Sequence, residues 1–277
     1  MKIQFLGTGA AEGFPAEFCN CENCIKVLGK EEECRTRSQV IIDDCLSIDF
    51  PPEAYAHSLA FGVRLSEIKY LLATHSHMDH FYAHDFILRG YKYATLTQPV
   101  LEIYGNEEVK KVFDECTARE MKPDVKPHVC INVIKPYQIL SIGEYRVISI
   151  PANHSKTEDA LLYYIEKNGI GYLHLYDTGR IADEALDFLK KNGAKADIVC
   201  LDCTFIEYTA GYNARHMGIE DGMAMKQKLS ERGIIDDNTK IIVSHFSHNS
   251  NPTRVHLKQI EEKYGVEAAY DGFTIEI

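Results

Sequence analysis

The chain has 277 residues, of which 45% are hydrophobic and 26% charged, ordinary globular values that exclude long disordered or fibrous segments. No apolar run approaches the ~18 residues that a membrane helix needs, so we expect no membrane partner. Thirty lysines and arginines stand against 41 aspartates and glutamates, and the resulting net charge of −11 disfavours a bulk electrostatic attraction to nucleic acid.

Short apolar runs typical of β-strands alternate with helical runs along most of the sequence. The predicted strands lie at residues 2–7, 39–44, 45–50, 70–74, 100–105, 128–134, 137–140, 144–151, 160–166, 171–177, 196–202, 240–245 and 273–277. The predicted helices lie at residues 52–62, 107–121, 183–191, 218–232 and 252–263. Two groups of strands with helices between them predict an α/β protein with two sheets packed face to face and helices outside. No stretch has the composition of a long linker, so we expect one domain over residues 1–277.

The N-terminus and the cysteines both bear on the cellular compartment. The first ten residues, MKIQFLGTGA, carry one lysine and a glycine-rich turn where a signal peptide would have its apolar segment. Nine cysteines are an odd number for a disulfide framework, and buried thiols account for most of them. We therefore expect a cytoplasmic protein.

The densest group of potential metal ligands follows the apolar run at residues 70–74. His75, His77, Asp79 and His80 lie within six positions. Imidazole nitrogen and carboxylate oxygen are ligands for divalent ions such as zinc, manganese or nickel. On an extended strand end, His75 and His77 point the same way, and a helix after them would bring Asp79 and His80 to the same place. The segment predicts two ligands for each of two adjacent ions, and the alternative is a solvated histidine-rich loop.

Three more polar residues end apolar runs elsewhere in the chain. His154 lies just before Ser155 at the end of the segment ISIPANHS, Asp177 ends the run GYLHLYD, and His245 ends IIVSH. Loops at strand ends of an α/β scaffold commonly carry its chemistry. Together these residues supply a third histidine for each ion and a carboxylate to bridge the two.

This pattern resembles the metallo-β-lactamase superfamily over essentially the whole chain, from the GTG turn at Gly7–Gly9 to Asp271-Gly272. The resemblance implies an αββα fold, with two packed mixed β-sheets flanked by helices. It also implies a dinuclear site in which one metal is bound by His75, His77 and His154, the other by Asp79, His80 and His245, and both by a bridging Asp177. A buried aspartate, Asp49, is implied to support the ligands from behind.

Further motifs occur together in the phosphoribosyl cyclic phosphate phosphodiesterases of the carbon–phosphorus lyase pathway, which the chain resembles. They are C-x-C-x-x-C at 19–24, NHSK at 153–156, the DC pair at 202–203, H-x-x-H at 245–248 and the DG pair at 271–272. The residues at 157–160 depart from that family, and the region 107–147 is not diagnostic. A related cysteine cluster marks the pyrroloquinoline-quinone accessory branch, where the histidine motif is eroded, whereas here it is complete.

A phosphodiester substrate also fits the charges. Two divalent ions outweigh their carboxylate ligands and a bridging hydroxide, so a phosphate is attracted to the ions within a protein of net charge −11. Metal coordination lowers the pKa of water toward ~7, and paired ions stabilise charge that builds on phosphorus.

A leaving alkoxide also needs a proton. The resemblance implies that His216, in the segment RHMG at 215–218, is the general acid, and we place it with Asp79 among the catalytic residues. The alternative is a surface histidine in a turn. Lys156 and Arg37 are weaker candidates for contacting the phosphate, with a solvated role as the alternative.

Cys19, Cys21, Cys24 and His248 predict a separate structural zinc. Three thiolates and one imidazole form a closed tetrahedral set without a position for water. C-x-C-x-x-C is too short to form its own finger, and His248 lies three residues beyond His245, so one loop would serve both sites. The competing interpretation is a set of free or redox-active thiols.

The sequence thus predicts a cytoplasmic phosphodiesterase with two zinc, manganese or nickel ions and one structural zinc, acting on a small cyclic phosphodiester such as a ribosyl cyclic phosphate or a cyclic nucleotide. Two alternatives are an endonuclease like the tRNA 3′-end processing enzymes and a non-catalytic accessory protein like the quinone-cofactor branch. We expect neither a membrane nor nucleic acid as a partner, and the sequence leaves a homodimer open.

Overall fold

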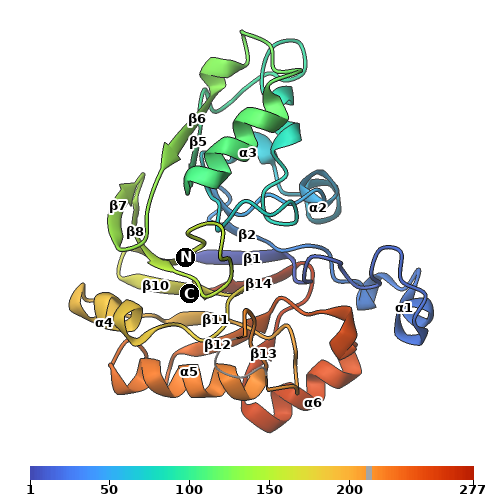
Figure 1. Cartoon of the computed structure of the whole chain (residues 1–277), viewed down its shortest axis with the longest axis vertical. Coiled ribbons are helices and arrows are strands. Elements are labelled where there is room, and N and C mark those ends of the chain that lie inside the picture. The colour runs from blue at the N-terminus through green and yellow to red at the C-terminus, as the bar shows by residue number, and fades with distance from the viewer. Residues whose placement is uncertain (210–213) are drawn as a thin grey trace.

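The computed structural model describes residues 1–209 and 214–277. In this part of the chain, the first sheet has seven strands in the order β14-β1-β2-β3-β4-β5-β6. Their bounds are β1 Lys2–Gly7, β2 Gln39–Ile42, β3 Leu46–Ile48, β4 Tyr70–Leu72, β5 Leu101–Gly105, β6 Val129–Val133 and β14 Phe273–Glu276. The pairing of β1 with β14 brings the two termini side by side (Figure 1).

The second sheet, over the same described residues, also has seven strands, in the order β13-β12-β11-β10-β9-β8-β7. Their bounds are β7 Gln138–Ile142, β8 Tyr145–Pro151, β9 Leu161–Lys167, β10 Ile170–Leu175, β11 Ile198–Asp202, β12 Lys240–Ser244 and β13 Glu267–Ala268. Neighbouring strands are antiparallel from β7 to β10 and parallel from β10 to β13, so the sheet is mixed.

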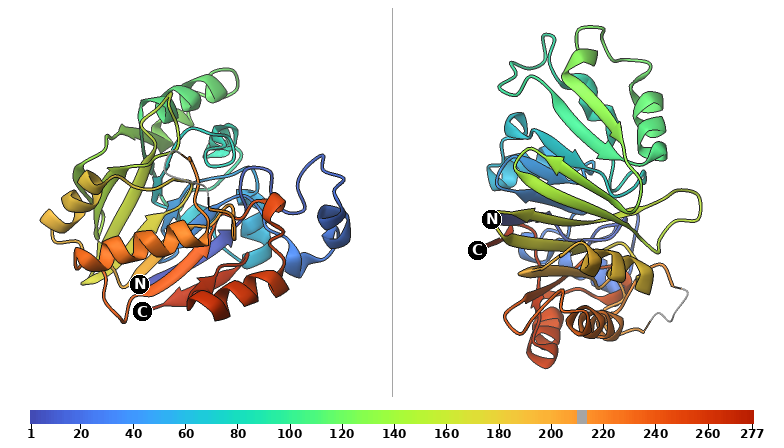
Figure 2. Two further views of the ribbon diagram at one scale, coloured as in Figure 1. Left: turned by 60° about the horizontal axis from the view of Figure 1, so that its bottom comes forward. Right: turned by 90° about the vertical axis from the view of Figure 1, so that its left-hand side faces the viewer.

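Three apolar layers hold the sheets and helices together. The middle layer joins the two sheets through residues such as Phe5, Val40, Tyr163 and Tyr172. The outer face of the first sheet is covered by α2 (Ala54–Phe61) and α3 (Glu107–Thr117), and that of the second by α4 (Asp183–Lys191), α5 (Ile219–Glu231) and α6 (Arg254–Tyr264) (Figures 1 and 2). Because β9 has protein on both faces, its first five residues, LLYYI, are all buried and do not alternate. The predicted αββα architecture is confirmed.

The local differences from the sequence prediction lie at turns and helix ends. The helix expected at 107–121 ends at Thr117. After His77 the chain makes a single turn, in which His80 and Phe81 donate to the His77 carbonyl, and a 3-10 helix follows only at Ala83–Leu88. The helix α1 (Glu22–Val27) and the two-residue strand β13 were not predicted.

The GTG turn shows why glycine is needed close to the site. A Cβ atom on Gly7 would lie 2.0 Å from the carbonyl oxygen of Arg37, and one on Gly9 would lie 2.7 Å from that of Arg35. The turn can therefore pass close to the segment before β2 only without side chains. Among the described residues, none of the helices combines the length and apolar character that a membrane span requires.

Candidate metal centre

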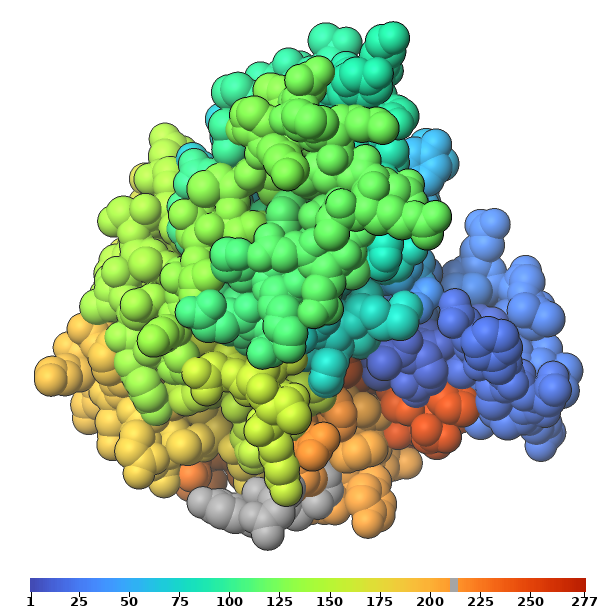
Figure 3. Space-filling model, turned by 45° about the horizontal axis from the view of Figure 1, so that its top comes forward, coloured from blue at the N-terminus to red at the C-terminus, as the bar shows by residue number. Residues whose placement is uncertain are grey.

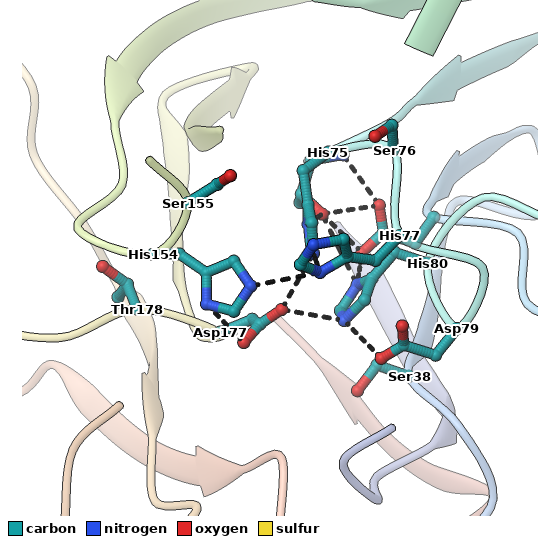
Figure 4. A network of polar contacts seen from close by, with 12 residues as sticks. Ser38, His75, Ser76, His77, Asp79, His80, His154, Ser155, Asp177 and Thr178 are labelled. Atoms are coloured by element: carbon teal, nitrogen blue, oxygen red, sulfur yellow. Dashed lines mark hydrogen bonds and ion pairs between the residues drawn. The ribbon is translucent and has the colours of Figure 1, made fainter. Parts of the chain in front are cut away.

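Seven of the predicted residues converge at one edge where strands of both sheets end. Figure 4 labels all of them except His245. His75 to His80 follow β4, His154 follows β8, Asp177 follows β10 and His245 directly follows β12. In the space-filling view, the yellow-green segment after β8 lies between the green region around α3 and the gold and orange regions of the second sheet (Figure 3). Both sheets thus contribute residues to the same cluster.

The first group of potential ligands contains His75, His77, His154 and Asp177, whose ligand atoms lie within 4.8 Å of one another. His77 Nδ1 is 2.8 Å from His75 Nε2 and 3.2 Å from His154 Nε2. The Asp177 carboxylate is 3.2 Å from His75 Nε2 through Oδ2 and 3.2 Å from His154 Nδ1 through Oδ1. His75 and His154 therefore turn nitrogens toward one carboxylate, and His77 lies against both rings.

The second group contains Asp79, His80 and His245, again within 4.8 Å. His80 Nε2 is 3.3 Å from Asp79 Oδ2 and 3.1 Å from Asp177 Oδ2, and His245 Nε2 is 3.8 Å from Asp177 Oδ1. Asp177 thus faces both groups, which is the position that a bridging ligand requires.

The residues fit divalent ions, because polar atoms here are buried without partners. Among the described residues, His80 Nε2, His154 Nδ1, His245 Nε2 and Asp177 Oδ1 are buried and have no hydrogen bond. Unsatisfied buried polar atoms are costly, and several directed at one point form a coordination set.

The protonation states of four of these residues also suit metal ligands. Burial lowers the pKa of His75, His154 and His245, which keeps these imidazoles neutral. Burial alone would raise the pKa of Asp177, but His245 and His80 outweigh it and hold that pKa well below its usual range. Neutral imidazole and ionised carboxylate are the forms that bind metal.

Asp49 lies behind the cluster and orients His80. Its Oδ2 accepts from His80 Nδ1 at 2.7 Å, and its Oδ1 accepts from the Thr74 amide at 2.8 Å. Such a contact directs the other ring nitrogen, Nε2, toward the site. Burial would lower the pKa of His80, but Asp79 and Asp49 outweigh it and raise that pKa.

Three residues of the cluster have left-handed backbone conformations. The φ angles are 62° at Asp49, 56° at Asp177 and 66° at His245, each just beyond a strand. This conformation costs non-glycine residues roughly 1–2 kcal/mol, and such strain concentrates at functional sites. The strand ends therefore turn sharply enough to bring these side chains together.

His216 lies at the edge of the cluster, with a side chain 24% exposed. Its Nδ1 is 3.2 Å from Asp177 Oδ1 and 3.5 Å from Asp202 Oδ2, and its ring stacks on His245 with centroids 5.7 Å apart. Burial would lower the pKa of His216, but hydrogen bonding to Asp202 outweighs it and raises that pKa to about 9.

Asp202 was not assigned a role from the sequence, although its position at the end of an apolar strand is the same as that of the predicted ligands. It is fully buried, and its Oδ1 accepts from the amides of Thr204 and Met217 at 3.0 and 2.9 Å. Its Oδ2 lies 3.7 Å from His245 Nδ1, so Asp202 faces both histidines of this side. The strand β11 lies between β10 and β12 and is parallel to both. Asp202, the last residue of β11, therefore lies beside Asp177 and His245, which follow those two strands.

Glu158 is a second residue that sequence reasoning missed. Its Oε1 accepts from Ser76 Oγ at 2.8 Å, and its Oε2 accepts from the Ser76 amide at 3.0 Å and from Asn106 Nδ2 at 2.8 Å. Ser76 stands between His75 and His77, so Glu158 joins the loop after His154 to the histidine motif. No local pattern around residue 158 signals this contact.

The two candidate phosphate contacts are placed differently. Lys156 lines a cavity of about 410 Å³ together with Asn106, Ser155 and Glu158, beside the first ligand group. The Arg37 guanidinium instead makes ion pairs with Glu53 at 2.7 Å and Glu17 at 3.1 Å. The structure does not bring Arg37 into the cluster, because these two carboxylates hold its side chain.

The cysteine motif meets His248, as expected. His248 Nδ1 lies 3.7, 4.0 and 3.6 Å from the Sγ atoms of Cys19, Cys21 and Cys24. Zinc–sulfur and zinc–nitrogen bonds of ~2.3 and ~2.0 Å in a tetrahedron give an S···N edge of about 3.6 Å. The nine cysteines, all in the described part of the chain, form no disulfide. The four side chains therefore fit one ion.

The thiols of this cluster differ in their pKa. The backbone amide of Cys24 and the side chain of His248 lower the pKa of Cys21 to about 6, whereas burial raises that of Cys24 to about 11. A lowered pKa favours the thiolate, the form that binds metal.

Comparisons with known proteins agree with this geometry. Residues 40–236 match the family model described as the beta-lactamase superfamily domain. A crystal structure of a diphosphatase of the PhnP family is similar, with a TM-score of 0.72 and 19% identity over 100% of this chain and 97% of that one. Zinc-bound PqqB from Methylobacterium extorquens has a TM-score of 0.71 and 18% identity over 100% of both chains.

Human tRNase Z, short form, has a TM-score of 0.69 and 17% identity over 100% of this chain and 99% of that one. Comparison of the sequence with curated proteins gives no match. At these identities the solved structures show the fold, and the family follows from the model that covers most of the chain. The chain therefore belongs to the beta-lactamase superfamily, in the metallo-β-lactamase fold.

Proposed function

We propose that the chain is a metal-dependent hydrolase that acts as a phosphodiesterase on a small cyclic phosphodiester. The observation that carries the proposal is the position of Asp177, whose two oxygens face two converging groups of ligands. His75, His77 and His154 would hold one divalent ion, Asp79, His80 and His245 would hold the second, and Asp177 would contact both. Such ions lower the pKa of coordinated water toward ~7 and offset charge that develops on phosphate oxygens.

The chain's own residues set the charge of the site. Asp79 and Asp177 are the carboxylates within the two ligand groups, and the remaining ligands are imidazoles. Two divalent cations therefore outweigh the charge of these two ligand carboxylates, within a chain of net charge −11. A small phosphate anion is then drawn to the cluster and not to the general surface.

His216 is positioned to hold the proton for the leaving group. Its Nδ1 is turned toward Asp177 and Asp202, so Nε2 is the nitrogen left to face a leaving alkoxide oxygen. Asp202 orients the ring from behind, as a carboxylate does for a catalytic imidazole. Lys156 lines the cavity beside His154. Its ammonium group is therefore placed to contact a phosphate oxygen at the edge of the metal centre.

The Cys19–Cys24 segment and His248 support a different role for their ion. Four protein ligands leave no open position, which favours structural zinc over a catalytic metal. The ion would fasten the N-terminal loop to the loop after β12, since His248 follows His245 by three residues.

The test is a screen of purified, metal-analysed protein against five-membered ribosyl cyclic phosphates, 2′,3′- and 3′,5′-cyclic nucleotides and a pre-tRNA, with Asp177→Ala as the matched control. We expect turnover of at least one small cyclic phosphate that the variant lacks. Cleavage of pre-tRNA alone would replace the proposal with an endonuclease. Metal binding without any turnover would favour an accessory protein.

A further inference from the structure

A cavity of about 230 Å³ lies between α6, β13 and the segment that carries Arg35, apart from both ligand clusters. The red helix α6 runs next to β13 in Figure 1. None of the lining residues belongs to either group of potential metal ligands. They are Arg35, Arg254, Val255, Leu257, Lys258, Glu261, Ala268 and Tyr270.

Arg35 contributes to this cavity a buried guanidinium that has no carboxylate of the described residues in ion-pair contact. Arg35 is only 2% exposed. Among the described residues, its Nη1 donates to the Ala269 carbonyl at 3.4 Å, its Nε has no hydrogen-bond partner, and no carboxylate lies within 4.0 Å. The ring of Phe246 lies 5.8 Å from the guanidinium carbon. Burial lowers the pKa of Arg35 and outweighs the carboxylate of Asp271, which lies beyond ion-pair distance. A buried guanidinium without a direct carboxylate contact is costly, so this position favours an anion.

The backbone keeps Arg35 in this place. Its amide donates to the Phe14 carbonyl at 2.7 Å, and its own carbonyl accepts from the Phe14 amide at 2.8 Å. The close approach of Gly9 to the same carbonyl fixes the other side. The guanidinium is therefore part of a rigid floor and not a surface side chain that folds inward.

Two more cations line the same cavity. The Arg254 guanidinium lies 4.5 Å from the centre of the Tyr270 ring, and Lys258 follows one helical turn later on α6. Glu261 is the one carboxylate in the lining, and its Oε1 already accepts from the Ala268 amide at 2.9 Å. The lining therefore has three cations and one carboxylate, and that carboxylate already accepts a backbone hydrogen bond.

We propose that this cavity binds the oxyanion group, carboxylate or phosphate, of a small ligand with a short apolar body. The anion lies between Arg35, Arg254 and Lys258, and the body contacts Val255 and Leu257. Arg35 supplies the directed donor, because a guanidinium offers N–H groups in a planar fork that matches such oxygens. The site is separate from the metal centre, and its ligand need not be the substrate.

The experiment uses the metal-loaded protein and calorimetric titration with inorganic phosphate, acetate and butyrate. The metal centre also attracts phosphate, so variants identify the site. Arg254→Gln with Lys258→Gln removes two cations of the cavity, and the matched control, Lys190→Gln with Lys191→Gln, removes two exposed cations of α4. We expect the first pair to weaken one class of anion binding roughly tenfold or more, and the control pair to leave it unchanged.

The ligand series separates the two sources of the anion. Butyrate that binds more tightly than acetate and phosphate indicates an apolar carboxylate, whereas phosphate that binds more tightly than both indicates a phosphate compound. Arg35→Met gives an independent readout, because it removes the directed donor and should abolish the same binding class in a variant that circular dichroism shows to be folded. Equal binding in wild type and in the Arg254/Lys258 variant, or binding only at the metal centre, would overturn the proposal.

Discussion

The His/Asp cluster takes its residues from the ends of strands in both sheets, whereas the Cys19–His248 cluster combines a loop, a six-residue helix and one distant histidine. Buried carboxylates behind the first cluster orient its rings, as Asp49 does for His80. The second cluster packs on a small apolar group of Phe14, Ala16, Cys24 and Val27. The fold therefore supports the first cluster with buried carboxylates of its own, whereas the second is held against a much smaller apolar group.

The largest effect is expected at the residue that faces both ligand groups. Asp177→Ala should lower kcat/KM for a cyclic phosphate by roughly 10³-fold or more, because it removes the contact shared by both ions and electrostatic stabilisation of this kind is usually a large catalytic term. Steady-state kinetics with circular dichroism separate loss of activity from loss of fold. Wild-type kinetics in this variant would remove Asp177 from the site.

The next largest effect depends on the leaving group. His216→Ala should reduce turnover of a substrate with a poor alkoxide leaving group by roughly 10²–10⁴-fold, since general acid catalysis contributes about that much. A nitrophenyl phosphodiester, which scarcely needs a proton, should lose much less. Equal losses on both substrates would show that His216 serves binding or folding.

Glu158 tests whether hydrogen bonds prearrange the first cluster. Glu158→Gln replaces an acceptor of the Ser76 amide and hydroxyl, and should reduce metal affinity or activity by roughly 10–100-fold, the usual effect of residues that hold metal ligands. Glu107→Gln is the matched control, because Glu107 lines the same cavity without bonding Ser76. Loss of affinity in the control alone would contradict this role.

The cysteine cluster should affect stability more than catalysis. Cys21→Ser with Cys24→Ser should lower Tm by roughly 2–8 °C, given that 1 kcal/mol shifts Tm by ~2–4 °C in a chain of similar size. Turnover below the transition should stay within a few-fold of wild type. Scanning calorimetry measures the Tm and steady-state kinetics measure the turnover. A double variant with unchanged Tm but no activity would show that the cysteine cluster serves catalysis and not stability.

A pH effect on folding is expected outside both clusters. His57 is buried, and burial lowers its pKa from 6.5 to about 4. The fold therefore favours its neutral form. The resulting contribution to the free energy of unfolding, about 3 kcal/mol, is complete above pH ~6.5 and is lost as the pH falls toward 4. Urea unfolding of wild type and His57→Gln between pH 4 and 7 measures it. Equal pH slopes in the two proteins would contradict the assignment.

The sequence predicted what local patterns determine. The apolar runs located the strands, and the H-x-H-x-D-H motif after β4 located the centre of the cluster. The helix considered as one way to bring Asp79 and His80 round does not form directly after His77, because one turn and the left-handed residues Asp177 and His245 close the site instead. The partners of Arg37 and Glu158 lie far away in sequence, and contacts of that kind follow only from the packed fold.

The metal content of three proteins tests the central claim, that two independent sites lie side by side. Elemental analysis would compare wild type, Asp177→Ala and the Cys21/Cys24 double serine variant, each confirmed as folded. We expect about three ions per wild-type chain, loss from the His/Asp cluster with one zinc retained in the first variant, and loss of one zinc alone in the second. Equal metal content in all three, or loss of every ion in both variants, would contradict it.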